Sequence, residues 1–294
     1  MPSHRTIGVA VLGAGLIGLD LLDRIRRSPW LECRLVAGHR QNLGLTRAAE
    51  TGLLTTTGGI TALVESIDGI DVVFDASNAD AHAEHWHHLE PTGALLVDLT
   101  PSNLGTATVP TVNGADAPSG RHISLISCGG QAAIPLLHAI AQHRTPHYVE
   151  LVSTGAGRSA GRATRLNLDE YIDTTQRAAH HFTGAPTAKV LVNLSPATPP
   201  PPFRVTLTAL VDAPDPATIL PLVQAAAQRV RAFAPGYAVT ALETVHDRVT
   251  ATVEVTATGD RIPAHAGNLE IINAAAIQVA ELRADAHHPE GARS

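Results

Sequence analysis

One cysteine of the sequence stands where a nucleophile could be activated. Cys128 lies in the string Ser127-Cys128-Gly129-Gly130-Gln131, between an apolar run and a segment with helical spacing. A helix N-terminus stabilises a thiolate and lowers the pKa of its thiol, and the thiolate is the attacking species. The glycines that follow let backbone N–H groups approach a substrate, as an oxyanion site requires. The string predicts covalent catalysis by Cys128, whereas Cys33, inside an apolar run without glycines, is interpreted as an inert buried thiol.

A glycine-rich turn near the N-terminus has the spacing G-x-G-x-x-G. The string Gly13-Ala14-Gly15-Leu16-Ile17-Gly18 follows an apolar run and opens a segment with helical spacing. In this arrangement the glycines permit a tight turn, close approach of a pyrophosphate and close packing of a helix on a strand. The helix N-terminus then attracts the phosphates. The pattern predicts a dinucleotide site at Gly13, Gly15, Leu16, Ile17 and Gly18, and the alternative is a plain structural turn.

The end of the next predicted strand bears on the choice of cofactor. NAD-specific folds usually carry an acidic residue there, about 20 residues after the turn, which holds the ribose 2′-hydroxyl. Here the position reads Gly38-His39-Arg40, and an arginine can pair with a 2′-phosphate. We expect Arg40 to contact the cofactor, so that NADP is at least tolerated beside NAD. The alternative is a solvated loop arginine.

Several histidines lie on one predicted helix of the first half of the chain. His82, His85 and His88 fall at i, i+3 and i+6, a spacing that can bind zinc. The same helix carries glutamates, and a solvated polar face would show the same pattern. We favour the solvated face and expect no metal site.

The apolar runs predict how these residues are positioned. In residues 1–127 the runs are short and almost wholly apolar, and helical patterns separate them, which indicates parallel strands covered on both faces. The predicted strands are 7–12, 33–37, 72–75, 94–98 and 122–127. The predicted helices between them are 16–27, 43–50, 59–66 and 79–90.

The second part of the chain has a different pattern. After a helix that begins near Gly130, period-two alternation indicates an antiparallel sheet with one covered face. The predicted strands are 148–154, 190–194, 203–211, 239–244 and 249–256, with helices at 166–183 and 216–233. A last helix at 268–282 precedes a polar tail, 283–294, that we expect to fray. The predicted fold class is α/β: a Rossmann-type doubly wound parallel sheet in residues 1–127, completed by the C-terminal helix in 268–294, plus an α+β domain in residues 128–267.

Composition excludes several classes of function. The 294 residues carry a formal net charge of -6 and no run of basic residues, which argues against a nucleic-acid or anionic-membrane surface. No apolar run approaches the roughly 20 residues that span a membrane. Two cysteines in a chain of this length do not form a disulfide framework, so we expect a soluble protein of the reducing cytoplasm.

Taken together, the motifs resemble the acylating acetaldehyde dehydrogenases, which share the two-domain plan of glyceraldehyde-phosphate and aspartate-semialdehyde dehydrogenases. The likeness runs over nearly the whole chain. Its most specific parts are Cys128-Gly129-Gly130-Gln131 and Ala266-Gly267-Asn268-Leu269. The supporting strings are Gly13–Gly18, Val73-Phe74-Asp75-Ala76, Val97-Asp98-Leu99-Thr100-Pro101, Ser159-Ala160-Gly161, Thr164-Arg165, Asn167-Leu168-Asp169-Glu170 and Pro263-Ala264.

The resemblance implies a reaction and a set of cofactor contacts. It implies that Cys128 attacks a short aldehyde, that hydride passes to NAD or NADP, and that the thioester is released to coenzyme A. Acetaldehyde to acetyl-CoA is the leading case. It also implies a catalytic and dimerisation role for the second domain, a homodimer, and an aldolase partner that feeds aldehyde. The residues that it places beside the nicotinamide half of the cofactor are Arg158, Ser159, Ala160, Gly161, Arg162, Ala163, Thr164, Arg165 and Asn268.

Departures from the family's strings keep other functions open. The family's Ser-Ala-Gly-Pro-Gly-Thr-Arg string has Arg162 and Ala163 in place of Pro-Gly. Its Arg-Asp-Thr string has Val205 at the acidic position, so a carboxylate that assists the cysteine chemistry is missing and the acyl acceptor stays open. His265 is then a candidate acid or base. The alternatives are an NADP-dependent semialdehyde dehydrogenase or carrier-thioester reductase that uses Cys128, and a non-catalytic dinucleotide-binding sensor or scaffold.

Overall fold

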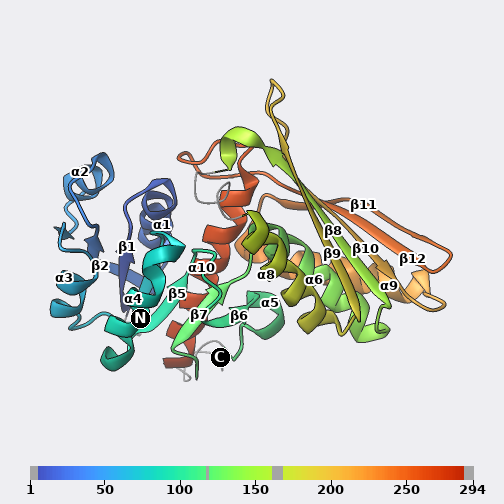
Figure 1. Cartoon of the computed structure of the whole chain (residues 1–294), viewed down its shortest axis with the longest axis horizontal. Helices are drawn as coiled ribbons and strands as arrows, with labels where there is room; N and C mark the ends of the chain where they lie inside the picture. Colours follow the sequence, from blue (N-terminus) through green and yellow to red (C-terminus); the bar gives the residue numbers. More distant parts are fainter. Residues whose placement is uncertain (1–5, 117–118, 161–167, 288–294) are drawn as a thin grey trace. The chain divides into compact units, whose positions relative to one another are not determined.

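The computed structural model describes residues 6–116, 119–160 and 168–287. The chain divides into two compact units, shown in the colours of the sequence in Figure 1. Unit 1 runs to Leu125 and resumes at Ala276, and unit 2 comprises Ile126–Ala275. Among the described residues, no helix is both long and apolar enough to cross a membrane.

A parallel sheet forms the centre of unit 1. Its strand order is β3-β2-β1-β4-β5-β7-β6, and each neighbouring pair is parallel. The strands of the described residues are β1 (Ile7–Leu12), β2 (Leu31–Ala37), β3 (Thr55–Thr56), β4 (Val72–Asp75), β5 (Leu95–Asp98), β6 (Thr106–Thr108) and β7 (His122–Leu125). Every residue of β1, β4 and β5 is buried, because helices cover both faces of a doubly wound sheet. The prediction of a Rossmann-type sheet is confirmed.

Polar residues start several helices of unit 1. Asn42 and Asn78 each precede a helix, and their side chains accept hydrogen bonds from the N–H groups of Leu45 and Ala81. The helices are α1 (Leu16–Arg27), α2 (Leu43–Glu50), α3 (Gly59–Glu65), α4 (Ala79–Leu89) and α5 (Pro110–Asn113), with a 3-10 turn at Glu90–Thr92. The sequence predicted neither β3, β6 nor α5, because segments of two to four residues show no periodicity.

Unit 2 contains a mixed sheet and not the antiparallel sheet that the alternation predicted. Its order is β11-β12-β10-β8-β9, and the pair β8–β9 is parallel. The strands are β8 (Tyr148–Ala156), β9 (Thr187–Ser195), β10 (Phe203–Leu210), β11 (Tyr237–Val245) and β12 (Arg248–Val255). The chain passes from β8 to β9 through α8 (Leu168–Thr183), and such a helical crossover joins parallel strands.

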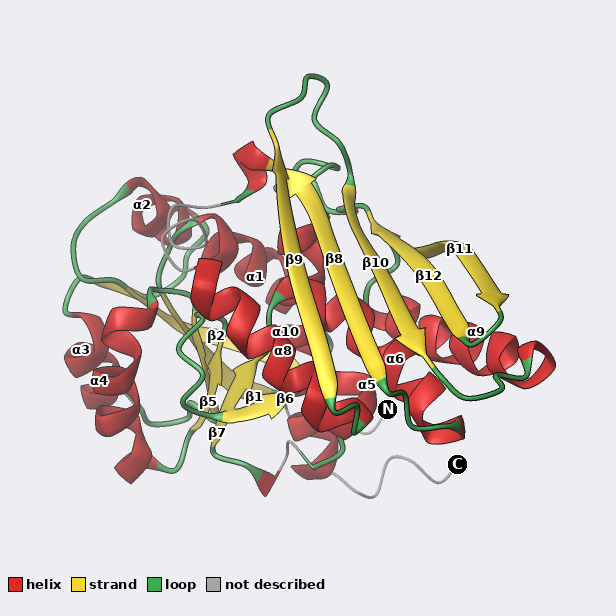
Figure 2. Ribbon diagram, turned by 45° about the vertical axis from the view of Figure 1, so that its right-hand side comes forward, coloured by secondary structure: helices red, strands yellow, loops and turns green. Residues whose placement is uncertain are grey.

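One face of this sheet is covered by helices. Figure 2 shows α6 (Cys128–His143), α8 and α9 (Pro216–Phe233) behind the five strands. On β10 alternate side chains are buried, and these are Phe203, Val205, Leu207 and Ala209. The last helix, α10 (Gly267–His287), continues past residue 282, so the prediction that the tail frays from residue 283 is wrong up to His287.

Candidate active site

Cys128 is the first residue of α6. The Ser127 side chain caps this helix, because its Oγ accepts a hydrogen bond of 3.0 Å from the N–H of Gly130. The helix begins three residues after Leu125, the carboxyl end of β7, and α/β folds place functional groups at such strand ends. The thiol therefore lies at the positive end of a sixteen-residue helix.

A tyrosine that the sequence analysis did not single out contacts the thiol. The hydroxyl oxygen of Tyr171 lies 3.5 Å from Sγ of Cys128 and accepts a hydrogen bond of 2.9 Å from the N–H of Gly129. It lies 3.5 Å from Oγ of Ser153 as well. A phenol has one proton, so Tyr171 can donate to the sulfur or to Ser153 but not to both. The tyrosine thus links the thiol, the start of α6 and the sheet.

The same helix that carries Tyr171 supports the cap of α6. The side-chain oxygens of Ser127 and Thr175 lie 2.5 Å apart, and the Thr175 hydroxyl donates a hydrogen bond of 2.6 Å to the carbonyl of Tyr171. Tyr171, Thr175 and Ser153 are buried. Because Cys128 and Tyr171 are 43 residues apart, only the fold brings them together, and no local pattern in the sequence could have found this contact.

The pKa of the Cys128 thiol is shifted in the opposite direction from the one expected. Burial raises the pKa of Cys128 above its usual range, and hydrogen bonds with Tyr171 and with the N–H of Gly129 offset only part of that rise. The expectation of a lowered pKa is therefore wrong for the free protein, because desolvation outweighs the helix terminus. Burial, with Cys128 beside it, also raises the pKa of Tyr171, which remains a neutral donor.

Cys33 lies in a strand as expected, but it is half-buried, as Cys128 is, and not fully buried. It lies within β2, and burial raises its pKa to about 11, although a contact with the carbonyl of Leu35 acts in the opposite direction. The two cysteines of the chain are therefore distinguished by position and not by the sign of the pKa shift. Only Cys128 lies at a helix terminus beside a hydroxyl donor.

The glycine turn of unit 1 has the geometry of a phosphate cradle. Gly13 adopts φ +104°, and a Cβ there would lie 2.6 Å from the carbonyl oxygen of Ala76. A Cβ on Gly18 would lie 1.9 Å from the carbonyl oxygen of Gly13, whereas a Cβ on Gly15 would meet nothing within 4 Å. The first and third glycines are thus required by packing, and the second leaves open space in front of α1. No side chain caps α1 at Gly15, so the helix terminus is suited to an anion.

The other predicted cofactor contacts are only partly described. Arg40 is exposed in the loop after β2, and Leu16 and Ile17 begin α1. Asn268 donates from Nδ2 to the carbonyl of Ser159 over 3.1 Å, so two segments that the resemblance assigned to one site do meet. Arg158 is exposed and Ala160 is buried. The remaining predicted residues, Gly161, Arg162, Ala163, Thr164 and Arg165, lie outside the described residues.

Two features near this segment are suited to a ligand. Oδ1 of Asn268 is buried and has no hydrogen-bond partner among the described residues. Arg158 lines a hollow of about 430 Å³ whose other lining residues are Gly157, Leu194, Ser195, Pro196 and Ala197. A buried acceptor without a donor costs free energy, so a ligand that supplies an N–H or O–H group would be favoured there.

The structure shows where Val205 lies, at the position of the family's carboxylate, and where His265, the candidate acid or base, lies. Val205 is fully buried on β10 directly opposite Ser153 of β8, and opposite residues of an antiparallel pair project to the same face. The departure from the family's string therefore lies beside the side chains that hold the thiol. His265 is part-exposed, and among the described residues it makes no hydrogen bond to Cys128. Its proposed role as acid or base gains no support.

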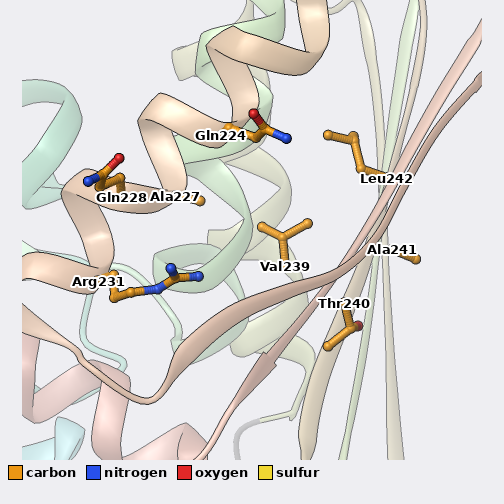
Figure 3. A pocket seen from close by; sticks show the side chains of 8 residues that line it. All are labelled: Gln224, Ala227, Gln228, Arg231, Val239, Thr240, Ala241 and Leu242. Carbon is orange, nitrogen blue, oxygen red and sulfur yellow. The ribbon is translucent and has the colours of Figure 1, made fainter.

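A second hollow of unit 2 lies between α9 and β11. It measures about 400 Å³ and is lined by Gln224, Ala227, Gln228, Arg231, Val239, Thr240, Ala241 and Leu242, shown as sticks in Figure 3. Nε of Arg231 donates to the carbonyl of Tyr237 over 3.0 Å. The lining is formed by amide, aliphatic and hydroxyl groups with one guanidinium, so it contains neither a thiol nor a carboxylate. The hollow is separate from the groups around Cys128.

The histidines of α4 are not arranged as the sequence analysis expected. His82 and His85 are fully buried, whereas His87 is exposed. The expectation of a solvated face is wrong for the two buried rings, because they face the carboxylate of Asp75 across the end of β4. Spacing alone could not separate the two cases, since a helix face with this period is equally compatible with solvent and with the core.

Comparisons with known proteins cover both units. The family model described as the prokaryotic acetaldehyde dehydrogenase dimerisation domain matches residues 128–263, and the semialdehyde dehydrogenase NAD-binding domain matches residues 8–115. The acetaldehyde dehydrogenase of Streptomyces griseus is 50% identical over 94% of this chain and 90% of its own length. That of Pectobacterium atrosepticum is 42% identical over 95% and 96%.

A solved structure supports the fold independently. Aspartate semialdehyde dehydrogenase II from Vibrio cholerae superposes with a TM-score of 0.65 over 95% of this chain and 98% of that one, at 15% identity. The predicted two-part fold is thereby confirmed, and the dimerisation model supports a homodimer. The dehydrogenase relatives and the NAD-binding model indicate an oxidoreductase with a nicotinamide dinucleotide. The chain belongs to the acetaldehyde dehydrogenase family.

Proposed function

We propose that the chain is an acylating aldehyde dehydrogenase that converts acetaldehyde, coenzyme A and NAD or NADP to acetyl-CoA and the reduced cofactor. The observation that carries the proposal is Cys128 at the start of α6, with its sulfur held by Tyr171. Membership of the family supplies the substrate class. The semialdehyde and carrier-thioester alternatives and the non-catalytic scaffold are not favoured, because the relatives are named acetaldehyde dehydrogenases.

In the first step the sulfur of Cys128 loses its proton and bonds to the aldehyde carbon, while the C=O π bond opens and its oxygen takes up a proton, which gives a thiohemiacetal. The raised pKa of the thiol means that this proton must leave as the bond forms or at a pH above neutral. Tyr171 stays protonated and can donate to the sulfur as its negative charge develops. A nicotinamide dinucleotide supplies the hydride acceptor when it is bound, so that the thiohemiacetal carbon becomes the carbon of a thioester.

Three features of the chain are suited to hold this cofactor. The open space in front of Gly15 and the uncapped N-terminus of α1 suit the pyrophosphate. The unpaired Oδ1 of Asn268 is an acceptor of the kind that the carboxamide N–H group of a nicotinamide would satisfy. Arg40, exposed after β2, can approach a 2′-phosphate, and we therefore propose that NADP is accepted beside NAD.

The second half-reaction transfers the acyl group from Cys128 to the thiol of coenzyme A. An attacking thiol must be deprotonated, and Val205 offers no proton acceptor where the family has a carboxylate. We expect a burst of reduced cofactor when aldehyde and coenzyme A are mixed with the enzyme, followed by a slower steady rate. The aldolase partner rests on the family resemblance alone.

Mass spectrometry of the intact protein tests the covalent step. Acetyl-CoA, or acetaldehyde with oxidised cofactor, should leave one acetyl group on the protein, and peptide mapping should locate it on Cys128. Cys33 is the matched control thiol, because it is the other cysteine of the chain and lies within a strand. The proposal fails if no adduct forms with either reagent, or if Cys33 is acylated and Cys128 is not.

A further inference from the structure

A cluster of ionisable side chains lies at the carboxyl end of the parallel sheet in unit 1. Asp75 and Asp98 end the neighbouring strands β4 and β5 and are paired in register. His82 and His85 are one turn apart on α4, and all four side chains are fully buried. His122, the first residue of β7, borders the cluster. The aldehyde chemistry proposed for Cys128 uses none of these groups.

The contacts converge on one carboxylate oxygen. Oδ2 of Asp75 lies 2.7 Å from Nδ1 of His82 and 2.7 Å from Nδ1 of His85. Nδ1 of His82 is also 3.4 Å from Oδ1 of Asp98. On the far side of the same ring, Nε2 of His82 lies 2.8 Å from Nε2 of His122. Two imidazole nitrogens and a carboxylate oxygen thus lie within 4.8 Å of one another.

Hydrogen bonding does not satisfy every group of this cluster. A neutral imidazole has one N–H and one lone pair, so His82 can donate to Asp75 and accept from His122. His85 can donate to Asp75 in the same way, but its Nε2 is then buried with no partner among the described residues. His82 lies within ion-pair distance of both Asp75 and Asp98, and His85 lies within ion-pair distance of Asp75. The cluster therefore leaves one buried ring nitrogen of His85 unpaired and brings two histidine rings onto two buried carboxylates.

We propose that Asp75, His82 and His85 bind one divalent transition-metal ion, with Zn²⁺ as the preferred occupant. Two imidazoles and one carboxylate form a mixed nitrogen and oxygen set, which suits Zn²⁺ and its neighbours better than Mg²⁺ or Ca²⁺. Bonds of about 2.0–2.2 Å place tetrahedral ligand atoms roughly 3.3 Å apart, so the hydrogen-bonded spacing would open by about half an ångström. Nε2 of His82 would then carry the ring's proton, and its contact with Nε2 of His122 would orient the ring.

The position of the cluster suggests a structural ion. Ala76 follows Asp75 directly, and its carbonyl oxygen is the atom that a Cβ on Gly13 would meet at 2.6 Å. The ring of His39, beside Arg40, stacks on that of His85 with centroids 5.8 Å apart. An ion on Asp75 and His85 would therefore fix both the turn that packs against the glycine turn and the end of β2.

A titration of the full-length, chelator-treated protein with Co²⁺ and Zn²⁺ tests the site. The measurement is made in the wild type and in a Cys128→Ser background, so that thiolate binding is excluded. His85→Asn is the principal variant, because its amide can still donate to Asp75 but offers no imidazole nitrogen to the ion. His87→Asn is the matched control on the exposed side of the same helix. We expect one ion per chain in the wild type, the Cys128→Ser protein and the control, with affinity lower by about tenfold or more in His85→Asn.

A second measurement does not depend on the folding of any variant. The X-ray absorption spectrum of the zinc-loaded wild type should show nitrogen and oxygen ligands with imidazole scattering and no sulfur. Equal Zn²⁺ affinity in the wild type and in His85→Asn, a sulfur shell in that spectrum, or loss of binding in Cys128→Ser would each overturn the proposal. The cluster would then be a metal-free network that shares protons.

Discussion

Each unit buries a cluster of polar side chains, and the two clusters are built from different groups. Around Cys128 the neighbours are hydroxyls, namely those of Ser127, Ser153, Tyr171 and Thr175. Around Asp75 they are imidazoles and a second carboxylate. The first set holds a thiol that must change its protonation state among neighbours that stay neutral. The second set keeps opposite charges or ligand atoms together in a place that water does not reach.

The electrostatics of the two clusters differ in the same way. Burial alone would raise the pKa of Asp75, but hydrogen bonds from His82 and His85 outweigh it and hold the pKa below its usual range. Burial and then the charge of His82 lower the pKa of His122 to about 4. At Cys128 the effect of burial prevails and the pKa of the thiol is raised, because hydroxyl and N–H donors offset desolvation less than charged partners do. A carboxylate is thus stabilised in its charged form, whereas the thiol is kept neutral until it reacts.

The largest expected effect comes from removing the thiol itself. Cys128→Ala should lower kcat for aldehyde oxidation by about a thousandfold or more, because the covalent route is lost. Binding of NAD or NADP, measured by calorimetry, should change little, since the glycine turn belongs to unit 1. Cys33→Ala is the matched control and should retain nearly full activity. Retention of even a tenth of the wild-type kcat by Cys128→Ala would contradict the covalent mechanism.

The charged cluster should contribute more to stability than the hydroxyl cluster. Asp75→Ala leaves two buried histidines without their shared acceptor, and breaking buried ion pairs in this way costs about 3–5 kcal/mol. Ser153→Ala removes a single long hydrogen bond and should cost about 1 kcal/mol. Urea denaturation of chelator-treated proteins measures both. Equal losses in the two variants would show that the clusters do not differ as described.

Removing the phenol should change the pH dependence of the reaction. Tyr171→Phe deletes a group that lowers the pKa of Cys128, so the thiol pKa rises further and less thiolate is present at neutral pH. The rising limb of kcat/KM should move to higher pH, so that activity at neutral pH falls by up to roughly tenfold and recovers in alkali. Tyr148→Phe, at the start of β8, is the control and should leave the profile in place. A uniform loss at every pH would mean that Tyr171 acts only through packing.

A carboxylate placed in the hydroxyl cluster should affect the two half-reactions differently. Val205→Asp restores a proton acceptor opposite Ser153, so the steady rate with coenzyme A should rise, by less than the roughly hundredfold that a well-positioned base contributes. The amplitude of the burst should stay the same, and stability should fall because the position is fully buried. Stopped-flow absorbance of the reduced cofactor separates the phases. A wild-type progress curve that is linear from the first turnover would show that Val205 does not limit transfer.

The smallest effect is expected outside both clusters. Arg40 is exposed and distant in sequence from either set, so Arg40→Asp should change only the choice of cofactor. A carboxylate there can hold a ribose 2′-hydroxyl and repels a 2′-phosphate, which should move the kcat/KM ratio several-fold toward NAD. Steady-state kinetics with both cofactors provides the comparison. Identical ratios before and after the substitution would exclude Arg40 from recognition of the 2′-phosphate.

The sequence predicted elements well and contacts poorly. The strand at Val72–Asp75 and the helix at Leu16–Arg27 were predicted with their observed bounds, because an apolar run and a 3.6-residue period are local signals. Alternation in this segment predicted a strand but not its direction, so the parallel pairing of β9 with β8 was missed. The partner of Cys128 was missed because Tyr171 lies on another helix of the same unit. Burial of His85 was missed because the core and the solvent impose the same spacing on a helix.

The discontinuity of unit 1 has a consequence for the order in which a ribosome can complete the fold. The late segment of this unit is tied to its early part, since the Ser28 hydroxyl donates to Glu281 over 2.6 Å and Ala284 is buried. At about 5–20 residues per second, the residues between Leu125 and Ala276 take roughly ten to thirty seconds to synthesise. During that interval the strands of the parallel sheet are already synthesised, but the part of α10 that belongs to unit 1 is not. Unit 2, which is continuous in the chain and contains Cys128, is therefore the first unit that a nascent polypeptide can finish.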